Sequence, residues 1–143
     1  MIYLGADEQA YDWKGLLKDV LESRGLKVVD LGVFDIEEVA DSPDIAREVS
    51  EKVLENPGSQ GILLDTTGVG MMMAANKLSG IRAFVASDEQ VVLKARGCAD
   101  ANIICIGSAL TPTFDEMAKL VDKFLTTEFD GSDESCRLVA KIN

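Results

Sequence analysis

The feature that most constrains the fold of this chain is a regular alternation of two kinds of segment. Short runs rich in Ile, Val and Leu have the length and composition of buried strands, and they cover residues 1–4, 26–29, 61–64, 81–85 and 102–106. Segments of helical period follow them, with apolar residues on one face, over residues 13–21, 45–54, 71–78, 89–96 and 114–124. Strands that alternate with helices of this length predict βαβ crossovers and a mostly parallel sheet.

The alternation therefore predicts an α/β fold. We expect a three-layer sandwich in which a five-stranded, mostly parallel sheet carries helices on both faces, with the flavodoxin-like strand order 2-1-3-4-5. Residues 126–143 are predicted to form a polar loop and a last helix that packs on a neighbouring subunit. A length of 143 residues corresponds to about one domain, so residues 1–143 are taken as a single domain.

Charge and residue usage exclude several functional classes. The 25 Asp and Glu residues outnumber 14 Lys and Arg, and the resulting net charge of −11 repels nucleic acid. The chain has no histidine, and its three cysteines have no CxxC spacing, which excludes a zinc ribbon, a Cys–His nucleophile pair and a Ser–His–Asp triad. Proton transfer must then use a carboxylate, a thiol, a lysine, a tyrosine or water. Because no apolar run approaches the ~20 residues of a membrane span and no secretory signal is visible, we expect a cytoplasmic protein with no membrane partner.

The candidate site lies where a parallel sheet binds ligands, beyond the carboxyl ends of strands at the point where the strand order reverses. In the expected order, the loops after the first and third strands flank that point. The second of these loops, residues 65–70, reads Asp-Thr-Thr-Gly-Val-Gly. Its glycines and the free N–H groups of a helix start suit a phosphate, a sugar hydroxyl or an enediolate oxygen. An ordinary strand-to-helix turn capped by a threonine is the open alternative.

Two carboxylates and a thiol are further candidates. Asp7 could face Asp65 across the crevice, where two close carboxylates drive one pKa upward, or it could simply cap the following helix. Cys98 becomes a reactive thiol only if a cation such as nearby Arg96 lowers its pKa. Cys105 lies in a predicted strand, which is typical of a buried, inert cysteine.

Five motifs occur in the order and spacing of a known family. They are Gly5-Ala6-Asp7, Asp41-Ser42-Pro43-Asp44, Thr67-Gly68-Val69-Gly70, the block from Ala74 to Arg82, and Asp100-Ala101-Asn102. On these motifs the chain resembles the ribose-5-phosphate isomerase B and galactose-6-phosphate isomerase family over essentially its whole length. The resemblance implies a Rossmann-like subunit of a dimer or tetramer, with sites built across the dimer interface. It also implies interconversion of phosphorylated aldoses and ketoses through an enediol, with no metal and no cofactor.

The resemblance also suggests roles for particular residues. Asp65 is the candidate base, Asp7 its catalytic partner, and Thr67 with the backbone amides from Gly68 to Gly70 would hold the oxyanion. The remaining candidate substrate contacts are Glu8, Thr66, Cys98, Arg137 and Lys141, the last two for the phosphate. The chain departs from the family at several of these positions. Asp65 replaces a cysteine base, Glu8 a histidine, Cys98-Ala99 a His-Asn pair, and residues 131–134 (Gly-Ser-Asp-Glu) a phosphate-binding Gly-Gly-Arg-His.

The departures suggest one branch of the family. Asp65, Gly5-Ala6-Asp7 and Ser87-Asp88-Glu89 are similar to the A subunit of galactose-6-phosphate isomerase, whereas residues 129–142 are more similar to its B subunit. We therefore expect a subunit of a galactose-6-phosphate isomerase-like enzyme, as a homo-oligomer or with a second family subunit. Two alternatives stay open: a non-catalytic structural or regulatory partner subunit, and a diverged isomerase of another sugar.

Overall fold

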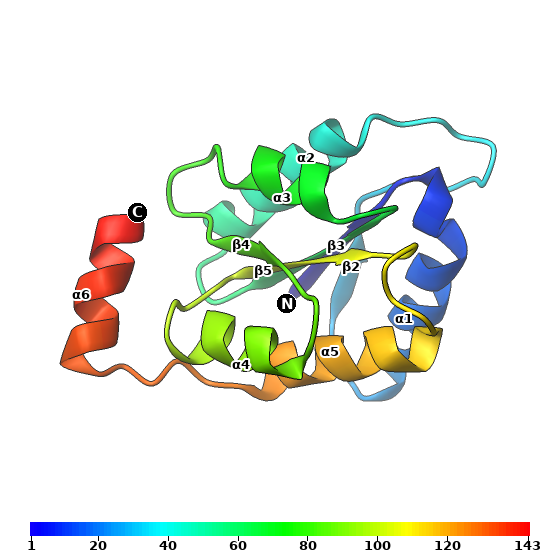
Figure 1. Ribbon diagram of the computed structural model, residues 1–143. Helices are drawn as coiled ribbons and strands as arrows, with labels where there is room; N and C mark the ends of the chain where they lie inside the picture. Colours follow the sequence, from blue (N-terminus) through cyan, green and yellow to red (C-terminus); the bar gives the residue numbers. More distant parts are fainter.

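The structure, a computed structural model, describes residues 1–143 as one parallel sheet with helices on both of its faces (Figure 1). The elements in chain order are β1 (Ile2–Ala6), the 3-10 helix η1 (Glu8–Ala10), α1 (Tyr11–Ser23), β2 (Val28–Asp30), α2 (Ser42–Glu55), β3 (Gln60–Asp65), α3 (Val69–Ala75), β4 (Ala83–Val85), α4 (Glu89–Gly97), β5 (Ile103–Gly107), α5 (Phe114–Thr126) and α6 (Asp133–Ile142). The α/β class, the five strands and the terminal helix are as predicted. None of the helices combines the length and the apolar character that crossing a bilayer requires.

The order of the strands differs from the expected one. The sheet runs β2-β1-β3-β5-β4, so β5 lies between β3 and β4 instead of at the edge. The reason lies in the strands themselves. Every residue of β5 is buried and the strand pairs on both sides, whereas β4 has three half-buried residues and pairs only with β5. A short, half-exposed strand suits the edge of a sheet, and a fully apolar one suits its interior.

Side-chain alternation along the strands builds a core on each face of the sheet. One core joins the even-numbered residues of β1, β3 and β5 to α1, α4 and α5, with Leu17, Val92 and Phe124 among its members. The other joins the odd-numbered strand residues to α2 and α3, through Val49 and Met71 among others. The three layers are therefore two helical layers around the sheet, as predicted.

Helix α6 stands apart from the three layers (Figure 1). Asp130 directs the chain into it: its backbone N–H donates to the Gly97 carbonyl at 2.9 Å, and its carboxylate accepts from the Ser135 hydroxyl at 3.0 Å. At the far end, Arg82 donates to the Asn143 side chain at 3.0 Å. Because Gly97 and Arg82 come just before β5 and β4, α6 lies at the amino edge of the sheet. Its apolar residues Leu138 and Ile142 are exposed.

Candidate active site

Asp7 and Asp65 lie side by side at the carboxyl edge of the sheet. Ala6 and Leu64 are paired in the β1–β3 ladder, and the Asp7 N–H donates to the Leu64 carbonyl at 3.3 Å. Tyr3 lies four residues before Asp7, and Leu63 lies two residues before Asp65. Because strand side chains alternate between the two faces, each shares a face with its aspartate, and both belong to the core beneath α2 and α3. Both carboxylates therefore start from the same face of the sheet, and the expected juxtaposition is present.

Asp7 serves both as a helix cap and as a neighbour of Asp65. It is 9% exposed, and its carboxylate accepts from the Gln9 N–H at 3.0 Å, at the start of η1. Burial raises the pKa of Asp7 above its usual value, and the Asp65 charge raises it further, against the opposing effect of the Gln9 bond. Asp7 therefore holds a proton more readily than an exposed aspartate does.

Asp65 holds the loop that follows it. The side chain is 5% exposed, and its Oδ1 accepts a hydrogen bond from the Gly68 N–H. Gly68 can turn back to make this bond because it adopts a φ of +79°, which favours glycine. The Thr67 hydroxyl accepts from the N–H of Val69, the first residue of α3, at 3.2 Å. The Gly68 and Val69 amides of the predicted oxyanion nest are thus hydrogen-bonded within the loop. Gly70 lies in the first turn of α3, where a backbone N–H has no acceptor within the helix.

The loop after β5 supports the Asp65 loop. Ser108 donates to the Asp65 carbonyl at 2.7 Å, and Ala109 to the Thr66 carbonyl at 3.0 Å. A Cβ on Gly107 would lie 2.6 Å from the carbonyl carbon of Thr67, so only glycine allows this approach. Sequence analysis did not identify these residues. The strand order it assumed placed β5 away from β3, although the glycine that ends the fifth strand was visible.

The other predicted residues divide between the two edges of the sheet. At the carboxyl edge, Thr66, Thr67 and Gly70 are exposed, and Glu8 accepts from the Ala40 N–H at 3.4 Å. At the amino edge lie three exposed residues, Cys98 just after α4 and Arg137 and Lys141 on α6. The six residues of β3 span about 16 Å between the edges. One chain does not bring these two groups together.

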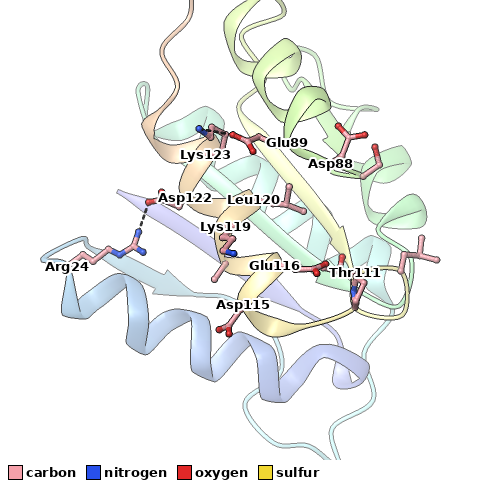
Figure 2. A pocket seen from close by; sticks show the side chains of 14 residues that line it. Arg24, Asp88, Glu89, Thr111, Asp115, Glu116, Lys119, Leu120, Asp122 and Lys123 are labelled. Carbon is pink, nitrogen blue, oxygen red and sulfur yellow. Dashed lines mark hydrogen bonds and ion pairs between the residues drawn. The ribbon is translucent and has the colours of Figure 1, made fainter.

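The principal cavities of the chain lie away from the aspartate pair, and none of them is lined by Asp7 or Asp65. The largest, of about 750 Å³, lies along α5 and the start of α4 (Figure 2). Charged side chains on its walls pair with one another, Lys123 with Glu89 at 2.9 Å and Arg24 with Asp122 at 2.6 Å. Around the aspartate loop, the apolar side chains of Val69, Met73 and Leu110 are exposed.

Comparison with known proteins identifies the family. Residues 2–142 match the Ribose/Galactose Isomerase family. A protein of Mycoplasma pneumoniae named as a probable ribose-5-phosphate isomerase B is 39% identical over 141 residues, which are 99% of this chain and 91% of that protein. The solved ribose-5-phosphate isomerase B of Clostridium thermocellum is 35% identical with a TM-score of 0.91, covering 99% of this chain and 93% of that one.

A further solved structure carries a ligand. It is the Mycoplasma genitalium ribose-5-phosphate isomerase B with bound ribulose 5-phosphate, 34% identical with a TM-score of 0.91, covering 99% of this chain and 93% of that one. Sequence and fold therefore agree over nearly the whole length of both molecules. The chain belongs to the Ribose/Galactose Isomerase family of sugar-phosphate isomerases.

Proposed function

We propose that this chain interconverts ribose 5-phosphate and ribulose 5-phosphate, with Asp65 as the base. The observation that carries the proposal is the pair of buried carboxylates at the carboxyl ends of β1 and β3. The names of the relatives favour a five-carbon sugar over the galactose 6-phosphate that the motifs suggested. Galactose 6-phosphate remains a substrate to test, because the family description includes galactose.

The two aspartates take opposite roles in the proposed reaction. In the forward reaction, the Asp65 carboxylate takes the proton from C2 of the open-chain aldose while neutral Asp7 gives a proton to the carbonyl oxygen on C1, which leaves an enediol. Asp65 then returns its proton to C1 as Asp7 takes the proton from the oxygen on C2, which leaves the ketose and restores both groups. The raised pKa of Asp7 makes it the acid of the pair.

A second copy of the chain completes the site in this proposal. Arg137 and Lys141 would hold the phosphate and Cys98 would contact the sugar, yet all three lie at the far edge of their own sheet. The exposed apolar residues of α6 and the exposed Val69, Met73 and Leu110 offer surface for such an association. Each site then takes its aspartates from one copy and its cations from the other.

The test is a comparison of wild-type protein with Asp65→Asn and, as a matched control, with Asp19→Asn at an exposed position on α1. Because an amide oxygen can still accept the Gly68 N–H, Asp65→Asn should fold. We expect it to lower kcat for ribose 5-phosphate by about 10²–10⁴-fold, as loss of a general base does. In D₂O the wild-type protein should also place deuterium at the exchanging carbon.

A structural, non-catalytic role of Asp65 is the second candidate, and the Asp65–Gly68 bond favours it, because a carboxylate used to cap a loop needs no reaction to explain it. An Asp65→Asn protein with the wild-type rate would establish this structural role and refute the base. Wild-type protein that isomerises neither ribose 5-phosphate nor galactose 6-phosphate would refute the proposed reaction.

A further inference from the structure

Lys14 is the one lysine that the fold buries, with 2% of its side chain exposed. Its ammonium group donates to the carbonyl oxygens of Gly32 and Val33 and lies 3.0 Å from a carboxylate oxygen of Asp30. The three N–H donors of the group thus face three oxygens. A buried ammonium without such partners would be costly, so this arrangement ties α1 firmly to the segment after β2.

The contacts continue from Lys14 to the aspartate pair through Gly32. Its N–H donates to the Asp30 carboxylate at 3.2 Å while its carbonyl accepts from Lys14, so both polar groups of the residue are held. A Cβ on Gly32 would lie 2.9 Å from the backbone nitrogen of Ala6, which shows how closely the segment packs on the end of β1. Asp7 is the next residue after Ala6.

Apart from Lys14, two features attach this segment, residues 31–41, to the sheet: the Leu31 N–H donates to the Leu4 carbonyl at 2.8 Å, and Val33 is buried in the core beneath α2 and α3. The segment contains no helix or strand, and cavities of about 500 and 340 Å³ lie beside it. Phe34, Ile36 and Val39 are exposed. Beyond Val33, two long hydrogen bonds join the segment to the beginning of the chain, from the Tyr11 hydroxyl to the Phe34 carbonyl at 3.3 Å and from the Ala40 N–H to Glu8 at 3.4 Å. Lys14 therefore supplies the one attachment of the segment that uses a buried cation.

We propose that Lys14 is a positioning residue: it anchors residues 31–41 against the end of β1 and thereby fixes Asp7 and Glu8 for isomerisation. The inference rests on the proposed function of the aspartate pair. Lys14 itself does not reach the reacting atoms, because its ammonium is enclosed by Asp30, Gly32 and Val33 and by the rings of Tyr11 and Phe34, whose centroids are 5.3 and 5.0 Å away. Its effect on the reaction passes through the backbone that it holds.

The experiment compares Lys14→Met with Lys18→Met in the full-length protein. Lys18 lies one turn further along α1 and makes only an exposed pair with Glu22 at 4.0 Å, so it is a matched control. In Lys14→Met we expect amide hydrogen exchange of residues 31–41 to become about tenfold faster or more, since the segment loses its anchor. We expect kcat to fall about 10- to 100-fold while KM stays within about threefold, as when catalytic groups lose alignment but binding persists.

Unchanged exchange of residues 31–41 in Lys14→Met would overturn the proposal, and so would faster exchange with a wild-type kcat. If Lys14→Met does not fold, Asp30→Asn serves in its place: it keeps the lysine but removes its charged partner, and both effects should appear at smaller size. Wild-type exchange and kcat in Asp30→Asn would then overturn the proposal. An inactive wild-type protein would refute the proposed function, whereas the exchange of residues 31–41 would still support or overturn the anchoring by Lys14.

Discussion

At the scale of single residues, the two aspartates have similar surroundings: each is buried and accepts one backbone N–H, Asp65 from Gly68 in its own loop and Asp7 from Gln9. The sequence predicted that both would lie in the loops after two adjacent strands, because Asp65 directly follows the third predicted strand and Asp7 lies two residues beyond the Gly5 that ends the first. It left open whether Asp7 would cap a helix or face Asp65, because a carboxylate at that position can do either. The structure shows both.

The raised pKa of Asp7 makes a prediction for stability against pH. Because the pKa of Asp7 is raised in the folded state, the folded protein binds this proton more tightly than the unfolded chain does. The stabilisation of the fold by this proton is complete below the usual pKa of aspartate, about 4, and is lost as pH rises through the raised value. Asp7→Asn cannot ionise, and its amide oxygen can still accept the Gln9 N–H. The melting temperature of Asp7→Asn relative to wild type should therefore rise between pH 3 and pH 7. A difference that is the same at both pH values would contradict the burial argument.

At the scale of elements, the sequence placed the five strands correctly but not their order. Periodicity reports whether a strand has one buried face or two, and β5, with an unbroken apolar run, has two. It does not report which strand lies next to it, because pairing is decided by the packing of the whole sheet. Helix η1 was missed for another reason: its three residues are too few to show a helical period.

Because β5 lies beside β3, its last residue, Gly107, packs against the loop that follows Asp65. Gly107→Ala would push the new methyl group into Thr67 and displace the loop that Asp65 holds. We expect a loss of about 1–3 kcal/mol in the free energy of unfolding, as for other overpacked positions, together with a lower kcat. Urea unfolding measures the first effect and isomerase kinetics the second.

Gly15 provides the control for this substitution. It lies within α1, and a Cβ there would meet nothing within 4 Å. Gly15→Ala should therefore raise the free energy of unfolding by about 0.5–1 kcal/mol, because alanine favours a helix over glycine. Equal effects of Gly107→Ala and Gly15→Ala would show that the loop can move aside and that the close approach has no functional importance.

At the scale of the whole molecule, the site residues suggested by motif comparison occupy opposite edges of one sheet. Sequence motifs carry no distances, so Asp65 and Arg137 could be grouped by role but not by position. The aspartates and the residues at the opposite edge also differ in exposure. The aspartates are buried within their own chain, whereas Arg137, Lys141 and Cys98 are exposed. If every site uses two copies of the chain, the aspartates of one copy and the exposed residues of the other can both take part in the same site.

Such a shared site predicts complementation between two inactive variants. Asp65→Asn and Arg137→Ala each damage both sites of a homodimer, but a mixed dimer contains one site that has Asp65 from one copy and Arg137 from the other. Dissociation and random reassociation of equal amounts make half of the dimers mixed, with one intact site of two, so about a quarter of wild-type activity should return. Arg137 is exposed, so its replacement should leave the fold of the single chain intact.

The control pairs Asp65→Asn with Asp7→Asn. These residues lie side by side on one chain, so a mixed dimer of the two variants has one damaged aspartate in each site and should recover no activity. Activity is measured as ketose formed after reassociation, and light scattering of the same sample reports the oligomer. If the Asp65→Asn and Arg137→Ala mixture gives only the sum of the two residual rates while the protein is a dimer, Arg137 of one copy does not serve the aspartates of the other.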